Sequence, residues 1–236
     1  MNVLILAGGY GTRLSEETSD KPKPMVILDD KPILWHIMNS YASQGYSDFT
    51  IAAGYKAEII IEWSKKLSSD WKIEVVNTGL DTQTGGRIKR CMAESAESEF
   101  FVTYGDGLAN VNLKKLLDFH RNNDRKATVT AVRPPARFGV LELDSGLVSH
   151  FGEKSQTDSG WINGGFFVLE KSVSEYIDSD TDSFEFNTLP KLVSDRELAA
   201  YQHEGFWQPM DTLRERNLLA DYLKKSGTPP WLEFLV

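Results

Sequence analysis

Residues 6–25 read LAGGYGTRLSEETSDKPKPM and follow directly on the apolar run Val3–Leu6. A short, continuous apolar run predicts a buried strand over Asn2–Ala7. Three glycines open the loop behind it: Gly8, Gly9 and Gly11. Glycine lets the backbone approach a ligand without a Cβ atom in the way, and successive N–H groups can point at an anion. The stretch therefore predicts an anion-binding turn at the end of a buried strand.

Two cations strengthen this prediction. Arg13 and Lys23 add positive charge to the loop, and Pro22 and Pro24 stiffen the backbone on both sides of Lys23. The segment matches neither GxxxxGK[ST] nor a GxGxxG that leads directly into a helix. The alternative is a plain strand-to-loop turn with solvated charges. The glycines and both cations together favour a phosphate site.

Strand and helix patterns alternate through the next hundred residues. Strands are predicted at 48–53, 72–76 and 100–104, and helices at 31–44, 56–67, 86–94 and 113–121. Such alternation is typical of βαβ units. It predicts an α/β fold with a Rossmann-like, mostly parallel sheet that helices flank.

From Ala127 the pattern changes. Short β-rich segments at 127–133, 139–144 and 146–151 are broken by Gly and Pro, strand character resumes at 161–169, and helices are predicted at 184–193 and 212–225. No stretch of linker composition interrupts the chain. We therefore expect a single domain over residues 1–236 that carries a small β-rich subdomain.

Composition excludes several classes of function. The net charge of −8 disfavours a general nucleic-acid surface, which needs a basic face. The single cysteine, Cys91, cannot form an intrachain disulfide, and with the four scattered histidines it gives no zinc-ligand pattern. The N-terminal apolar run is too short for a membrane span and lacks the basic flank of a signal peptide. We expect a cytoplasmic protein that binds neither nucleic acid nor membrane.

Five motifs together resemble those of the sugar-1-phosphate nucleotidyltransferases. LAGGxGTRL followed by KPKPM is similar to the signature of the whole superfamily, and TGGR (84–87) and TYGDG (103–107) narrow the match. WINGGFF (161–167) and GFWQPMDT (205–212) resemble the glucose-1-phosphate cytidylyltransferase branch. The resemblance covers almost the whole chain. It departs at Ser155, where the family usually has proline after Glu-Lys, so we expect a less rigid loop there.

This resemblance implies transfer of a cytidylyl group from CTP to glucose 1-phosphate, giving CDP-glucose and pyrophosphate. In-line attack of the sugar phosphate on the α-phosphorus depends on positioning and charge neutralisation. The resemblance implies Mg²⁺ held by Asp106 and Asp211, since this ion takes one or two carboxylates plus phosphate oxygens. Arg13 and Lys23 would hold the β- and γ-phosphates, and Lys154 the phosphate of the sugar. Arg13, Lys23, Asp106 and Lys154 are thus the expected catalytic residues.

The same resemblance implies two sets of binding residues. The nucleotide set is Leu6, Ala7, Gly8, Gly9, Gly11, Thr12, Arg13, Lys23, Thr84, Gly85, Gly86 and Arg87. The sugar-phosphate set is Tyr104, Glu153, Lys154, Asn163, Gly164 and Gly165. They divide the domain into a nucleotide-binding half, about 1–125, and a sugar-phosphate-binding half, about 126–236, that ends in the C-terminal helix. The resemblance also implies a homo-oligomer.

Simpler structural roles remain open for several of these residues. Asp106 is a common turn residue in Gly-Asp-Gly, Asp211 could cap the following helix, and Lys154 could be a solvated charge. The glycine pair at 85–86 could equally be no more than the start of a helix, and Asn163-Gly164-Gly165 could be a tight turn.

The sequence also supports two structural expectations and leaves two alternative functions open. His36 is expected to be a packed histidine in an amphipathic helix, and the apolar tail 229–236 is expected to dock on the body or on another subunit. Uridylyl or thymidylyl transfer is the main alternative activity. A non-catalytic homologue with a regulatory role is the second.

Overall fold

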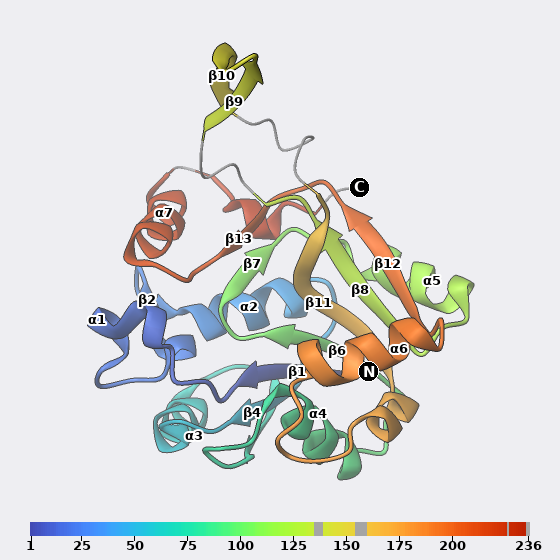
Figure 1. Cartoon of the computed structure of the whole chain (residues 1–236). Helices are drawn as coiled ribbons and strands as arrows, with labels where there is room; N and C mark the ends of the chain where they lie inside the picture. The colour runs from blue at the N-terminus through green and yellow to red at the C-terminus, as the bar shows by residue number, and fades with distance from the viewer. Residues whose placement is uncertain (135–138, 154–159, 226, 235–236) are drawn as a thin grey trace.

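A seven-stranded sheet forms the centre of the molecule (Figure 1). The structure is a computed structural model and describes residues 1–134, 139–153, 160–225 and 227–234. The strands of the sheet are β1 (Asn2–Ala7), β4 (Asp48–Ala53), β5 (Lys72–Asn77), β6 (Glu99–Tyr104), β8 (Ala127–Val132), β11 (Ile162–Glu170) and β12 (Leu198–His203). Their spatial order is β12-β8-β11-β6-β1-β4-β5.

The sheet is mostly parallel. β1 runs parallel to β4 and β6, β4 to β5, and β8 to β12, whereas β11 runs antiparallel to both β6 and β8. The predicted α/β class with a mostly parallel sheet is confirmed. The strands β8 and β11, from the β-rich part of the sequence, join this sheet.

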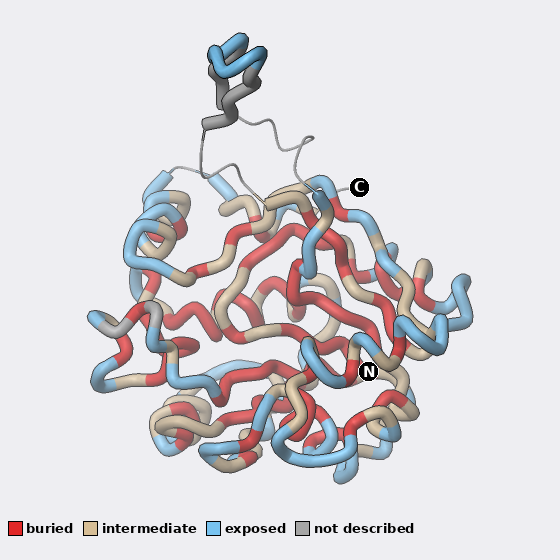
Figure 2. The backbone as a smooth tube through the Cα atoms, viewed as in Figure 1, coloured by how far each residue is buried: buried red, intermediate tan, exposed pale blue. Residues whose placement is uncertain are grey.

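Helices cover both faces of the sheet. They are α1 (Ser15–Thr18), α2 (Ile33–Ala42), α3 (Ala57–Lys66), α4 (Thr84–Ala93), α5 (Leu113–Asn123), α6 (Leu189–Ser194) and α7 (Leu213–Lys224). Side chains alternate between faces along a strand, so Val3 and Ile5 pack with residues of α2, α3 and α5, while Leu4 packs with residues of α4 and α6. Figure 2 shows the resulting band of buried backbone through the central strands.

The described residues also form three two-stranded sheets outside the central sheet. They pair β2 (Ile27–Leu28) with β3 (Lys31–Pro32), β7 (Gly107–Ala109) with β13 (Trp207–Pro209), and β9 (Gly139–Asp144) with β10 (Leu147–Glu153). The hairpin of β9 and β10 is separate from the central sheet (Figure 1). Among the described helices, none has the length and hydrophobicity needed to cross a bilayer.

One helical prediction needs correction, and one alternative is excluded. The segment predicted as one helix over 184–193 is a π-helix, Phe184–Thr188, followed by α6. The cap of α7 is Thr212, whose side chain accepts a hydrogen bond from the backbone of Glu215, while the Glu215 side chain accepts one from the Thr212 backbone. This capping box provides hydrogen-bond acceptors for backbone N–H groups at the start of the helix. Asp211 is therefore not the N-cap residue.

The C-terminal tail docks on the body of the same chain. Trp231 is fully buried, and its carbonyl accepts a hydrogen bond of 3.2 Å from Ser40 in α2. The ring of His36 meets Trp231 edge-on at 5.7 Å between centroids, and His36 Nε2 donates to the Leu28 carbonyl. His36 is thus a packed histidine, as predicted.

Candidate active site

Two adjacent parallel strands bring the glycine loop and the Gly-Asp-Gly turn to one edge of the sheet. Leu6 of β1 pairs with Tyr104 of β6, and the Gly105 N–H donates to the Leu6 carbonyl at 2.9 Å. Ligands of open α/β sheets bind outside the carboxyl ends of the strands. The residues just after β1 and β6 therefore face a common binding region.

A short strand pair adds Asp211 to this region. β13 runs antiparallel to β7, with Pro209 opposite Gly107, and the Met210 N–H donates to the Asp106 carbonyl at 2.8 Å. Since Asp211 follows directly on this pair, it lies beside Asp106 although the two are distant in sequence. The geometry brings together both carboxylates expected at one site.

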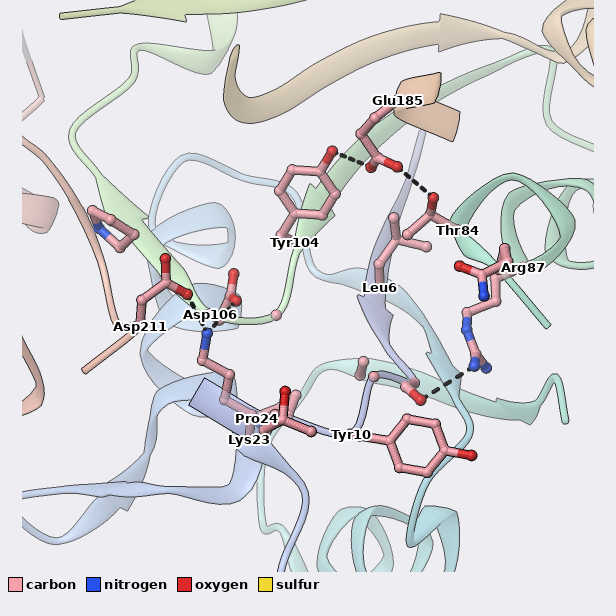
Figure 3. Close-up of a pocket in the computed structure, with 18 of the residues that line it drawn as sticks. Leu6, Tyr10, Lys23, Pro24, Thr84, Arg87, Tyr104, Asp106, Glu185 and Asp211 are labelled. Carbon is pink, nitrogen blue, oxygen red and sulfur yellow. Dashed lines mark hydrogen bonds and ion pairs between the residues drawn. The ribbon is translucent and has the colours of Figure 1, made fainter. Parts of the chain in front are cut away.

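Lys23 joins the two carboxylates (Figure 3). Its Nζ lies 2.7 Å from Oδ2 of Asp106 and 2.7 Å from Oδ1 of Asp211. The lysine side chain is only 10% exposed. Burial by itself would lower the pKa of Lys23, but the charge of Asp106 and hydrogen bonds to both carboxylates raise the pKa above its usual value. The lysine is therefore held as a cation between two anions.

The glycine loop has a defined backbone conformation. Gly11 has φ +66°, in the left-handed region that favours glycine. Its carbonyl accepts hydrogen bonds from the Leu14 N–H at 3.0 Å and from the Thr18 hydroxyl at 3.1 Å. These contacts fix the backbone of the loop at Gly11.

Arg87 lines the pocket and connects several segments beside it. It is buried, and its guanidinium donates to the carbonyls of Ala53 at 3.1 Å, Gly79 at 2.9 Å and Gly8 at 3.2 Å. A Cβ atom on Gly8 would lie 2.2 Å from the Arg87 guanidinium carbon. Arg87 lines the pocket, but these contacts make it a residue that fixes the glycine loop to its neighbours.

Gly85 and Gly86 face the protein and do not line the pocket. A Cβ atom on Gly85 would lie 2.6 Å from the Asp182 carbonyl oxygen, and one on Gly86 would lie 2.6 Å from the Asp180 Cα. Both glycines therefore allow α4 to pack closely on the segment that precedes the π-helix. Their expected role in nucleotide binding stays a prediction. The start of α4 at Thr84 agrees with the simpler alternative.

The pocket has a volume of about 760 Å³, within the range of small-molecule sites. The expected site residues that line it are Leu6, Ala7, Gly8, Gly9, Gly11, Thr12, Lys23, Thr84, Arg87, Tyr104, Asp106, Asn163 and Asp211. Gly164 and Gly165 line a smaller adjoining cavity with Tyr104 and Asp106. The side chains of Arg13 and Glu153, and the whole of Lys154 and Ser155, lie outside the described part of the structure.

Several lining residues were not predicted as site residues, among them Glu185, Trp207 and Tyr10. Glu185 lies on the π-helix, Trp207 on β13, and Tyr10 inside the glycine loop. Trp207 Nε1 donates to the Gly164 carbonyl at 2.7 Å and so connects β13 to the Asn-Gly-Gly turn. Trp207 could have been found, because it belongs to the GFWQPMDT motif. Glu185 has no comparable motif around it.

The paired carboxylates suit a hard cation. Oxygens of Asp106 and Asp211 reach the same nitrogen atom of Lys23, so both can reach one point in the pocket. Within the described residues, no group of three or more His, Cys, Asp and Glu side chains could hold a metal ion. Two carboxylates fit an ion that completes its coordination with water and phosphate oxygens, as Mg²⁺ does.

Comparisons with known proteins identify the family of this chain. The nucleotidyl transferase family model matches residues 2–214. The chain is 44% identical to the glucose-1-phosphate cytidylyltransferase of Salmonella typhi, over 98% of both chains. It is 42% identical to the probable glucose-1-phosphate cytidylyltransferase of Bacillus subtilis (strain 168), over 93% of this chain and 94% of that protein.

A solved structure shares the fold. The crystal structure of HddC from Yersinia pseudotuberculosis superposes with a TM-score of 0.76 at 28% identity, over 94% of this chain and 99% of that one. The matched family model spans the glycine loop, Lys23 and both carboxylates. The chain belongs to the nucleotidyl transferase family.

Proposed function

We propose that this protein transfers the cytidylyl group of CTP to α-D-glucose 1-phosphate, giving CDP-glucose and pyrophosphate. The activities named for relatives at 44% and 42% identity support the choice of base and sugar. The observation that carries the proposal is the contact of Lys23 with both Asp106 and Asp211 at the edge of the glycine-lined pocket. Such a cluster combines a cation for phosphate with carboxylates for a metal ion.

Each element of the site has a proposed task. The glycine loop and Lys23 bind the triphosphate, where positive charge stabilises the departing pyrophosphate. Arg13 adds to this charge. Asp106 and Asp211 hold Mg²⁺. When bound, Mg²⁺ supplies Lewis-acid neutralisation of phosphate charge. The protein then needs no covalent nucleophile, because positioning of the sugar phosphate opposite the leaving group accounts for most of the catalysis.

The sugar phosphate is proposed to bind toward residues of the second half of the chain. Lys154 would contact its phosphate, and Glu153 and Asn163 would contact its hydroxyls. Asn163 lines the pocket and donates to the Tyr104 hydroxyl at 3.4 Å. These assignments keep the division into a nucleotide-binding half, about 1–125, and a sugar-phosphate-binding half, about 126–236.

The test is pyrophosphate release with four NTPs and several sugar 1-phosphates. CTP with glucose 1-phosphate and Mg²⁺ should give the highest kcat/KM of the panel. Much faster use of UTP or dTTP would contradict the cytidylyl assignment and leave the family unchanged. Absence of pyrophosphate release from every pair would favour a non-catalytic homologue. The proposed homo-oligomer is tested by light scattering of the purified protein, where a monomeric mass would contradict it.

A further inference from the structure

Glu185 lies in the wall of the pocket, on the π-helix Phe184–Thr188. Its carboxylate accepts a hydrogen bond from the Tyr104 hydroxyl, and its Oε2 accepts from Thr84 Oγ1 at 2.7 Å and from Ser183 Oγ at 2.7 Å. Tyr104 ends β6, Thr84 begins α4, and Ser183 precedes the π-helix. Three hydroxyls from separate segments thus orient one carboxylate. Figure 3 shows two of them, those of Tyr104 and Thr84.

The carboxylate retains the capacity to bind a ligand. An ionised carboxylate has about four acceptor positions, and three hydroxyl donors occupy three of them. Glu185 is half-buried and borders the cavity, so the remaining position is available to a donor inside the pocket. Burial, followed by the negative charge of Glu185, raises the pKa of Tyr104, which keeps this hydroxyl protonated as a donor.

The chemistry of a carboxylate restricts what it can contact. It accepts hydrogen bonds and repels phosphate, so its partner in the ligand is a hydroxyl or an amine. Figure 3 shows Glu185 with Tyr104 and Thr84 as a group separate from Lys23, Asp106 and Asp211. This separation matches a substrate whose phosphate lies at one end of the pocket and whose hydroxyls lie at another.

Tyr104 connects Glu185 to the proposed sugar site. Its hydroxyl donates to Glu185 and accepts from Asn163 Nδ2 at 3.4 Å. We infer that Glu185 determines sugar specificity by accepting a hydrogen bond from one hydroxyl of the sugar 1-phosphate. The inference rests on the proposed function, because it names a contact of the same substrate.

The test combines the Glu185→Gln variant with modified substrates. Glutamine keeps the size of the side chain. Its amide oxygen can accept from the hydroxyls at one position, and its NH2 group can donate to those at the other, since a hydroxyl can also accept. With glucose 1-phosphate, we expect kcat/KM to fall about 10- to 100-fold. The dissociation constant of CTP, measured by calorimetry, should stay within about threefold of the wild-type value. Glu175→Gln, an exposed carboxylate of the same half, is the matched control and should leave both quantities unchanged.

A series of 2-, 3-, 4- and 6-deoxyglucose 1-phosphates identifies the contact. In wild type, kcat/KM should be about 10- to 100-fold lower for one analogue than for glucose 1-phosphate. In Glu185→Gln, kcat/KM should be nearly the same for that analogue and for glucose 1-phosphate, because the contact is already missing. If the effect of Glu185→Gln on kcat/KM multiplied with the effect of removing the hydroxyl for every analogue, the inference would be overturned. The inference would also be overturned if replacing CTP with dCTP lowered kcat/KM in wild type but not in Glu185→Gln, because that result would place the contact on the ribose. Wild-type enzyme that makes no CDP-glucose would refute the proposed function, whereas active wild type with an unaffected Glu185→Gln variant refutes this inference alone.

Discussion

The ammonium nitrogen of Lys23 lies 2.7 Å from a carboxylate oxygen of Asp106 and equally close to one of Asp211. The charge of the lysine offsets the repulsion that two neighbouring carboxylates would otherwise exert on each other. The lysine comes from the segment after the glycine loop, and the carboxylates follow β6 and β13. The cluster therefore depends on the complete fold of the chain.

Gly165→Ala should impair use of glucose 1-phosphate. Gly165 has φ +80°, and a Cβ atom there would lie 2.5 Å from Cδ2 of Tyr104. The substitution strains the backbone and displaces Tyr104, the donor to Glu185. We expect kcat/KM for glucose 1-phosphate to fall about tenfold or more, with a smaller change in CTP affinity. Steady-state kinetics with each substrate varied in turn measure both.

Gly160→Ala provides the comparison for this variant. Gly160 is exposed, and an added Cβ atom would have no heavy atom within 4 Å. It should behave as wild type. Unchanged kinetics in Gly165→Ala as well would show that the position of Tyr104 does not matter for the sugar substrate.

Lys154→Ala tests the proposed contact with the sugar phosphate. A hydrogen bond to a charged group contributes about 1.5–3 kcal/mol, or roughly 10- to 100-fold in affinity. We expect the KM for glucose 1-phosphate to rise by this factor while the dissociation constant of CTP stays nearly unchanged. Equal weakening of CTP would assign the lysine to the other substrate. Ser155→Pro, which restores the usual family residue, should be tolerated.

Stability should fall as the pH drops below about 6.5. Burial lowers the pKa of His36, and likewise those of His120 and His203. The unfolded chain, with ordinary histidine pKa values, therefore takes up protons before the folded protein does, and acid favours unfolding. Each unit by which a pKa is lowered costs about 1.4 kcal/mol once the pH is below both values.

Urea unfolding between pH 5 and pH 8 measures this dependence. His36→Gln removes one of these buried histidines, so the free energy of unfolding should change less with pH than it does in wild type. An identical pH dependence in the two proteins would exclude His36 as a contributor.

The order of strands and helices in the first half could be predicted because buried strands and amphipathic helices have distinct periods there. The strand β12 could not be predicted. It is an edge strand that pairs only with β8, and its sequence LAAYQH contains two alanines, which are depleted in strands. The π-helix was also missed, because Phe184–Ser194 has an apolar pattern that a single α-helix would share.

The sequence motifs led to Lys23, Asp106 and Asp211 but did not explain how they meet. The pairing of β7 with β13 brings the carboxylates together, and each of these strands has only three residues. Gly85 and Gly86 were expected among the nucleotide-binding residues, because a glycine that admits a ligand and a glycine that admits protein backbone look alike in sequence. Glu185 could not be predicted, since its position depends on hydroxyls from three separate segments.

The central claim is that Asp106 and Asp211 act as one unit beside Lys23. It is tested most directly by the turnover of Asp106→Asn, Asp211→Asn and the double variant, measured as CDP-glucose formed from saturating CTP and glucose 1-phosphate. Asparagine keeps the size of the side chain and removes its charge. Each single variant should lose about 100-fold or more in kcat, and the double variant should be scarcely worse than the worse single variant. Part of the activity should return at higher Mg²⁺ or with Mn²⁺. Near-normal turnover in either single variant, or losses that multiply in the double variant, would contradict the claim.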